Sequence, residues 1–288
     1  MDDTTRQRAI TLYDRFTHEG LERRAFMAEM VKLAGSIAAA ELLVAGIAAS
    51  PAAAAIVAPD DKRLTTRTQE LTGGYQAYVA EPRSRSLKAT VVVIHENRGL
   101  NDHIRDVARR VAIEGFRAVA PDMLSPAGGT PANEDAARTA IGKLDVGKAV
   151  NDAVAFVGEL GKSSRGGKVG AVGFCWGGGF VNRLAVAAGS ELSAAVPYYG
   201  PAPDPSEAPK VEAAMLIHDA GLDERVNRTS FPWVEALRAN KKNVKFFLYK
   251  GVNHAFNNDT SAERYNKAAA DLAWRRTLAF FGRHLRAS

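Results

Sequence analysis

Cysteine is the scarcest residue in this chain, which has one, Cys175, among 288 residues. A single thiol excludes an intrachain disulfide. No grouping of cysteine and histidine has the spacing of a zinc site, so we expect neither a metal nor a cofactor. Hydrophobic residues make up 46% and charged residues 24% of the chain, a composition typical of a globular protein and not of a disordered one.

Long runs of one charge are also missing, as are internal repeats and low-complexity segments after residue 58. The net charge of +6 is spread along the chain, which favours a solvated basic surface over a nucleic-acid-binding one. The expected partner is a small molecule, and the basic balance would attract an anionic one. The length suits one large domain, or one domain preceded by a leader segment. It does not indicate an oligomeric state.

Residues 1–57 differ from the rest of the chain. The pair Arg23-Arg24 leads into an alanine-rich apolar stretch at 33–55, and the small residues at 51–55 resemble a cleavage site. This pattern predicts a twin-arginine export signal and a periplasmic or secreted protein. The alternative is a helical arm that stays on a cytoplasmic protein. Glu41 interrupts the apolar stretch, so a permanent membrane span is not expected.

Strands alternate with helices through residues 58–288, which we predict to form one domain. This alternation indicates a mostly parallel sheet with helices on both faces. The hairpin that opens the domain is predicted at 68–71 and 75–80, joined by two glycines. The other predicted strands are 90–94, 116–120, 168–174, 194–198, 213–217 and 244–249; the predicted helices are 102–114, 132–160 with a break at 145–147, 177–188, 233–240 and 262–284.

The sequence Gly173-Phe174-Cys175-Trp176-Gly177 has the form of a strand-to-helix elbow that presents a nucleophile, with sulfur in place of the usual serine hydroxyl. Such a turn crowds the backbone around the nucleophile, so small residues are needed two positions away on each side. The elbow therefore predicts a nucleophilic thiol. The alternative is a buried cysteine that acts only as a small hydrophobe.

A thiol nucleophile needs a base, and the base needs an acidic group that orients it. In proteins with this elbow the chain order is nucleophile, acid, histidine. His254 follows the last predicted strand and is the favoured base, with His218 as its rival. For the acid, Asp223 is favoured over Asp219; Glu224 lies in the same loop.

The oxyanion that forms on the substrate when the sulfur attacks a carbonyl group would need two backbone N–H donors. The elbow predicts Trp176 as one donor, and the loop after strand 90–94 predicts Asn97 as the other. Glu96 in that loop has two interpretations. It either pairs at the surface with Arg98 or Arg105, or it holds the thiol and accepts its proton.

These motifs together resemble the dienelactone hydrolase (carboxymethylenebutenolidase) family, from about residue 75 to residue 281. The resemblance implies the α/β-hydrolase fold, a triad of Cys175, His254 and Asp223, and Glu96 as the partner of the resting thiol. It also implies Asn97 and Trp176 as oxyanion donors. The motifs that carry it are 92–99, Ala120-Pro121-Asp122, Gly173 to Gly178, Gly221-Leu222-Asp223, Asn253-His254-Ala255-Phe256 and the tail 265–281.

The chain also departs from the family pattern. Members of the family bind a substrate carboxylate with arginines, one of them four residues after the triad histidine, where this chain has Asn258. Arg138 lies in the region of a second arginine and is left unassigned. The predicted function is hydrolysis of a lactone or small ester through an acyl-enzyme. The alternatives are a general aryl or alkyl esterase and a non-catalytic binding protein of the same fold.

Overall fold

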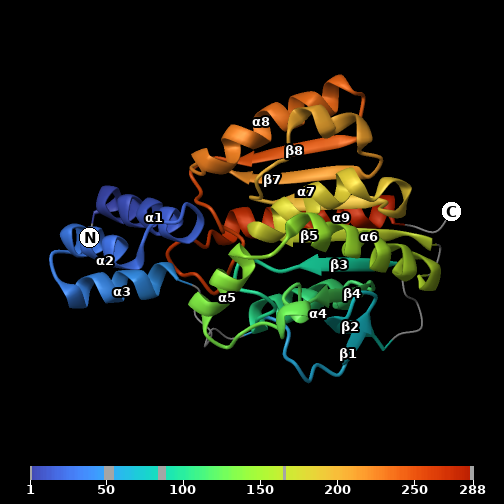
Figure 1. Cartoon of the computed structure of the whole chain (residues 1–288), viewed down its shortest axis with the longest axis horizontal. Helices are drawn as coiled ribbons and strands as arrows, with labels where there is room; N and C mark the ends of the chain where they lie inside the picture. Colours follow the sequence, from blue (N-terminus) through green and yellow to red (C-terminus); the bar gives the residue numbers. More distant parts are fainter. Residues whose placement is uncertain (1, 49–54, 84–88, 165–166, 286–288) are drawn as a thin grey trace.

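An eight-stranded sheet forms the centre of the molecule in this computed structural model, which describes residues 2–48, 55–83, 89–164 and 167–285 (Figure 1). The strand order is β1-β2-β4-β3-β5-β6-β7-β8. β2 is antiparallel to β1 and to β4, and every other neighbouring pair is parallel. The strands are β1 Leu64–Leu71, β2 Tyr75–Pro82, β3 Thr90–Ile94, β4 Arg117–Pro121, β5 Val169–Phe174, β6 Ala194–Tyr198, β7 Ala214–Ala220 and β8 Val244–Tyr249.

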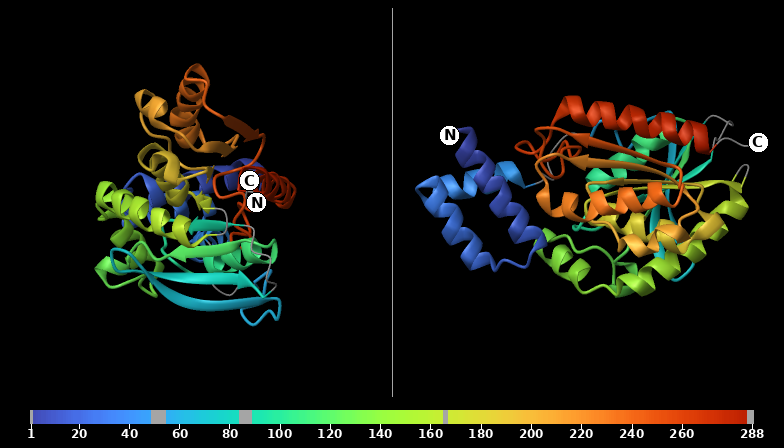
Figure 2. Two further views of the ribbon diagram at one scale, coloured as in Figure 1. Left: turned by 90° about the vertical axis from the view of Figure 1, so that its right-hand side faces the viewer. Right: turned by 90° about the horizontal axis from the view of Figure 1, so that it is seen from above.

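Helices cover both faces of this sheet. α4 and α9 contribute to the apolar cluster on one face, and α6, α7 and α8 contribute to the cluster on the other. Figure 2 shows α9 and α6 on opposite sides of the strands. The predicted α/β-hydrolase architecture is confirmed. The helices are α4 Asp102–Ile113, α5 Glu134–Gly142, α6 Val146–Ser163, α7 Trp176–Ala187, α8 Glu224–Ala239 and α9 Lys267–His284, with short 3-10 turns at Ser125–Ala127, Gly189–Glu191 and Pro205–Lys210.

Most element boundaries agree with the sequence predictions, and two helices begin elsewhere. Strands 90–94, 194–198 and 244–249 are confirmed, and so is the helix break near 145–147, where Asp145 caps α6. The helix predicted from residue 233 begins at Glu224 because the Asp223 side chain accepts the N–H of Val226 and caps it. The last helix begins at Lys267, not at residue 262, because Asn266 caps it.

Three further helices, α1 (Asp3–His18), α2 (Arg23–Ala34) and α3 (Ile37–Ile47), precede the sheet domain. Their apolar side chains pack on one another in a cluster that is separate from the two clusters of the sheet. In Figure 1 they lie together beyond the end of the sheet to which β3 points. The N-terminal segment therefore forms a small helical unit with its own core.

None of the described helices is by itself long and apolar enough to cross a membrane, although α2 and α3, bent by 106° at their junction, pass that test as a pair. Residues 51–54 of the predicted cleavage site lie outside the described residues. Export through a twin-arginine signal remains a prediction.

Candidate active site

Cys175 lies in the tight turn between β5 and α7, with φ 56° and ψ −115°. A Cβ atom on Gly173 would lie 2.2 Å from the carbonyl oxygen of Gly177, and one on Gly177 would lie 2.4 Å from the carbonyl oxygen of His95. Both contacts are far shorter than a carbon atom tolerates. The glycines two positions on each side of the cysteine are therefore required by the elbow, as predicted. Cys175 itself is 5% exposed.

His254 and Asp223 meet beside this sulfur. The Nδ1 atom of His254 is 2.5 Å from Oδ2 of Asp223, and both side chains are buried. Oδ1 of Asp223 accepts the N–H of Val226 at 3.1 Å, so the helix cap also fixes the carboxylate. A ring nitrogen of His254 lies within 4.8 Å of the Cys175 sulfur. The fold thus brings together Cys175, Asp223 and His254 from three separate loops, as predicted for a nucleophile, its acid and its base.

Electrostatic interaction between His254 and Asp223 controls the protonation of both side chains. Burial by itself would lower the pKa of His254, but the Asp223 carboxylate and the Cys175 sulfur outweigh burial and raise the pKa to about 10. Burial would likewise raise the pKa of Asp223, and the neighbouring His254 holds it below the ordinary value. The imidazole is therefore positively charged at neutral pH.

The rival residues lie outside the site. His218 is fully buried between Tyr249 and Thr277, and burial lowers its pKa to about 3, so it is a neutral core residue. Asp219 is also fully buried, and burial raises its pKa to about 7. Asp223, and not Asp219, makes the hydrogen bond to His254.

Glu96 is 7% exposed and makes no surface ion pair with Arg98 or Arg105, whose partners are Glu134 and Asp102. Its Oε2 atom accepts a hydrogen bond from Nδ2 of Asn258 at 2.7 Å, and its Oε1 atom has no hydrogen-bond partner among the described residues. The surface-pair interpretation is therefore wrong.

Asn258, four residues after His254, holds that acid in place. Asn258 is buried, and its Oδ1 accepts hydrogen bonds from the N–H and the hydroxyl of Thr260 at 3.0 and 2.6 Å. Its amide nitrogen is thus directed to Glu96 and not to the pocket. The unassigned Arg138 donates to the carbonyl oxygen of Phe16 at 2.7 Å, which makes it a contact of the N-terminal helices.

The two predicted oxyanion donors lie at the ends of β3 and β5. Trp176 is the first residue of α7, and the first N–H groups of a helix have no partner within the helix. Its indole stacks on the ring of His95, whose Nε2 accepts the N–H of Met123 at 3.1 Å. Asn97 is half-buried in the following loop, and its side chain donates to the carbonyl oxygen of Thr17 at 3.4 Å.

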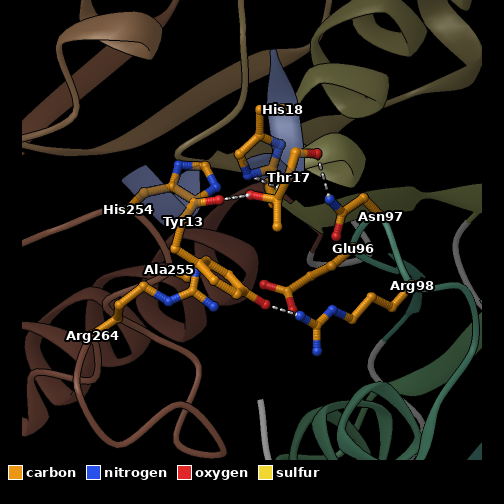
Figure 3. A pocket seen from close by; sticks show the side chains of 10 residues that line it. Tyr13, Thr17, His18, Glu96, Asn97, Arg98, His254, Ala255 and Arg264 are labelled. Carbon is orange, nitrogen blue, oxygen red and sulfur yellow. Dashed lines mark hydrogen bonds between the residues drawn. The ribbon is translucent and has the colours of Figure 1, made fainter. Parts of the chain in front are cut away.

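The N-terminal unit contributes residues that the sequence analysis missed. Nε2 of His18, the last residue of α1, lies 3.8 Å from the Cys175 sulfur, and its ring lies 4.8 Å from that of His254. Burial, and then the charge of His254, hold the pKa of His18 well below its ordinary value, so this imidazole is neutral. Figure 3 shows the residues of α1 beside those of the sheet domain; the pocket is lined by Tyr13, Thr17, His18, Glu96, Asn97, Arg98, Cys175, His254, Ala255 and Arg264.

Two arginines line the same pocket, and residues of α1 contact both. Arg98 donates to the hydroxyl of Tyr13 and pairs with Glu134. Arg264 lies 5.1 Å from the centre of the Tyr13 ring and 3.4 Å from a carboxylate oxygen of Asp14. Each guanidinium group also has a carboxylate partner, Glu134 for Arg98 and Asp14 for Arg264.

Among the described residues, one group of side chains could hold a metal ion. The ligand atoms of His18, Cys175 and His254 all lie within 4.8 Å of one another. Imidazole and thiolate ligands are those that zinc prefers. The same three groups also form a site for acid–base and thiol chemistry that needs no metal.

Comparison with known proteins agrees with this geometry. The model of the dienelactone hydrolase family matches residues 75–285. The chain is 32% identical over 254 residues to the "Putative carboxymethylenebutenolidase" of Escherichia coli O157:H7, an alignment that covers 81% of this chain and 93% of the relative. A protein of the same name from Saccharolobus solfataricus is 30% identical, with 72% and 93% covered.

A solved structure supports the same assignment. The crystal structure named "Putative Dienelactone Hydrolase", from Klebsiella pneumoniae, superposes with a TM-score of 0.67 at 25% identity and covers 76% of this chain and 99% of its own. The region that the family model matches contains strands β2 to β8, the elbow and the loops that carry His254 and Asp223, and only β1 of the sheet precedes it. The chain belongs to the dienelactone hydrolase family and is a hydrolase of the ester and lactone type.

Proposed function

We propose that Cys175 is the nucleophile of a thiol hydrolase that opens a lactone or small carboxylic ester through an acyl-enzyme, with His254 as base and acid and Asp223 as its orienting carboxylate. One observation carries the proposal. The sulfur, the imidazole and the carboxylate adjoin in that order, with ligand atoms of the first two within 4.8 Å and of the last two 2.5 Å apart. Thiol-based acyl transfer uses these three groups in this order, and Nε2 of His254, which has no hydrogen-bond partner among the described residues, is free to receive the sulfur.

In the first half-reaction the Cys175 thiolate, paired with the His254 imidazolium, attacks the carbonyl carbon of the ester and forms a C–S bond. The carbonyl oxygen becomes an oxyanion, which the N–H groups of Trp176 and Asn97 stabilise. When the oxyanion collapses, the bond to the leaving oxygen breaks and the His254 imidazolium gives that oxygen its proton. The raised pKa of His254 supports this role, because the proton is present at neutral pH before the attack.

In the second half-reaction the now neutral His254 removes a proton from a water molecule, which attacks the thioester. The C–S bond breaks, the carboxylic acid is released and the thiolate–imidazolium pair is restored. Asp223 keeps the Nδ1 proton of the ring in place through both steps, so Nε2 remains the nitrogen that exchanges protons.

Two arginines in the pocket lining support an anionic substrate. Asn258 holds Glu96 and leaves no guanidinium at the position from which the family binds a substrate carboxylate. Arg98 and Arg264 line the pocket, and either can receive a carboxylate once the contacts with Tyr13 and Asp14 are released. We therefore propose lactones and esters that carry an acidic group, with neutral aryl or alkyl esters as the alternative.

A substrate panel tests this proposal. Matched lactones and aryl esters with and without a carboxylate are assayed on the wild type, on Cys175→Ala and on His254→Gln. We expect turnover by the wild type, faster with the carboxylate, and a loss of at least about a thousandfold in both variants. His284→Gln, in the last turn of α9, is the matched histidine control and should retain full activity.

Two outcomes would contradict the proposal. Turnover retained by Cys175→Ala would exclude the sulfur as nucleophile. Absence of turnover of every substrate by a folded wild type, with Cys175 inert to alkylation, would favour the non-catalytic binding protein instead.

A further inference from the structure

The space at the Cys175 sulfur is too small for any ester. The pocket has a volume of about 20 Å³. A cavity of that size holds roughly one water molecule, whereas ligand sites usually measure at least about 300 Å³. A lactone can therefore reach the sulfur only if part of the wall moves.

The residues that line this pocket differ in how firmly they are anchored to the central sheet. Cys175, His254 and Glu96 lie at the ends of buried strands of the central sheet or in the loops that follow them, where displacement would disrupt the core. Tyr13, Thr17 and His18 belong to α1, whose apolar side chains pack within the N-terminal unit. α1 is therefore the wall that can move without unpacking the sheet.

The contacts that the structure gives between the N-terminal unit and the sheet domain are largely polar. The amide groups of Gln7 and Asn253 exchange hydrogen bonds of 2.6 and 3.1 Å, and Arg6 pairs with Glu263 at 2.6 Å. Exposed and half-exposed pairs of this kind contribute little to stability because water replaces them readily. Buried polar contacts also join the two parts, among them the hydroxyl of Ser261 to the carbonyl oxygen of Ile47 at 2.6 Å and Arg264 with Asp14 at 3.4 Å. All of these are polar groups that water can satisfy, so α1 can move away from the sulfur while both parts stay folded.

His18 lies directly beside the nucleophile. Its Nε2 atom lies 3.8 Å from the sulfur, within the space where a carbonyl group must lie during attack. We propose that α1 is a lid on the thiol site and that His18 is the residue that fills the acyl position until substrate displaces it. His18 then sets which acyl groups enter, because entry requires its side chain to leave.

The lid is compatible with either fate of residues 1–57. If the segment is a signal that is removed after export, the precursor carries a closed thiol and the mature protein an open one. If the segment is retained, the lid opens and closes in each turnover. In both cases the full chain has a thiol that α1 covers.

The rate of alkylation of the only cysteine measures how accessible the lid leaves the sulfur in the full-length protein. Rates of reaction with iodoacetamide are compared for the wild type, His18→Ala, Gln7→Ala and His18→Trp. We expect His18→Ala to raise the rate about fivefold or more and Gln7→Ala, which loosens the lid far from the sulfur, about twofold. His18→Trp should lower the rate. Arg15→Ala, an exposed residue of α1 paired only with Glu19, is the control and should leave the rate unchanged.

An unchanged or lower rate in His18→Ala would overturn the proposal, since the sulfur would then be open already or depend on His18 for its reactivity. An unchanged alkylation rate in Gln7→Ala would mean that only the His18 side chain moves to expose the sulfur. That result would overturn the proposal that α1 is a lid.

Turnover is measured on the same variants, and this part of the test rests on the proposed function. His18→Ala should lower KM for esters with bulky acyl groups more than for acetyl esters. If no variant turns over any ester but the alkylation series behaves as expected, the proposed function fails and the lid stands. If esters are hydrolysed and the alkylation rates are all equal, the lid fails and the function stands.

Discussion

Glu96 places a buried carboxyl group in a site that already contains a thiol and two imidazoles. Nothing in an ordinary ester hydrolysis requires it. One of its oxygens is held by Asn258, and the other has no hydrogen-bond partner among the described residues. A carboxyl oxygen left without a partner costs free energy, so its presence favours a role for the acid in the chemistry of the thiol.

Glu96→Gln tests this role. The amide oxygen can still accept the hydrogen bond from Asn258, so we expect the melting temperature to stay within a few degrees of the wild type. The pH dependence of Cys175 alkylation should change, because the substitution removes a titratable group from the pocket. An alkylation profile identical to that of the wild type would make Glu96 a structural residue only.

At the scale of the element, the turn from β5 into α7 shows how a local motif specifies a site. Gly177 packs its Cα against the carbonyl oxygens of Ile94 and His95, so the elbow and the loop after β3 are pressed together. That contact brings Trp176 and Asn97, the two proposed oxyanion donors, to one end of the sheet. The glycines therefore position both the nucleophile and its surroundings.

Gly177→Ala should disrupt this element. The added Cβ would lie 2.4–2.5 Å from two backbone oxygens, which cannot rotate away, so the loop after β3 must shift. We expect a loss of about 3 kcal/mol in the free energy of unfolding, measured with denaturant, and nearly complete loss of activity. The control is Gly282→Ala in α9, where a Cβ meets nothing within 4 Å; it should stabilise the protein by up to about 1 kcal/mol. Equal stability of the two variants would contradict this account.

The strands, the elbow and the positions of Cys175, His254 and Asp223 could be predicted because each has a local signal. Buried parallel strands are continuous apolar runs, and their carboxyl ends meet at one edge. The lid could not be predicted in this way. His18 lies 157 positions from Cys175, and its place at the sulfur follows from the docking of a separate helical unit. No periodicity or spacing in the sequence encodes such docking. The start of α8 differs from the prediction because Asp223 has two roles at once: its Oδ1 atom caps the helix while its Oδ2 atom contacts His254.

At the scale of the whole molecule, the His254 imidazolium and the Asp223 carboxylate make the stability of the folded protein depend on pH. The pKa of His254 is about 10 in the folded protein, above its ordinary value of about 6.5. A raised pKa means that the folded state binds the proton more tightly. This contribution to stability is therefore complete below about pH 6.5 and disappears as the pH rises through 10.

His254→Gln should reduce this dependence on pH. Between pH 7 and pH 10.5, the free energy of unfolding of the wild type should fall more steeply than that of the variant, because only the wild type loses the imidazolium–carboxylate interaction. Denaturant titrations of both proteins across this range measure the difference. Parallel curves would show that the folded state does not raise the pKa of this histidine.

The N-terminal unit gives a prediction for the intact protein in its native cell. If the twin-arginine signal functions, the protein recovered from outside the cytoplasm should begin near Ile56, and Arg23→Lys with Arg24→Lys should keep the full-length chain inside. Intact mass spectrometry of fractionated cells measures both. A full-length protein in the cytoplasm of wild-type cells would contradict export and would make the helices a permanent lid.

The central claim is that the Cys175 sulfur carries the acyl group during turnover. Mass spectrometry of the protein quenched in acid during ester hydrolysis tests this claim most directly. We predict an adduct with the mass of the acyl group on the peptide that contains Cys175, absent from Cys175→Ala. Turnover at a normal rate with Cys175 unmodified at every time point, and the acyl group on another residue or on none, would contradict the account.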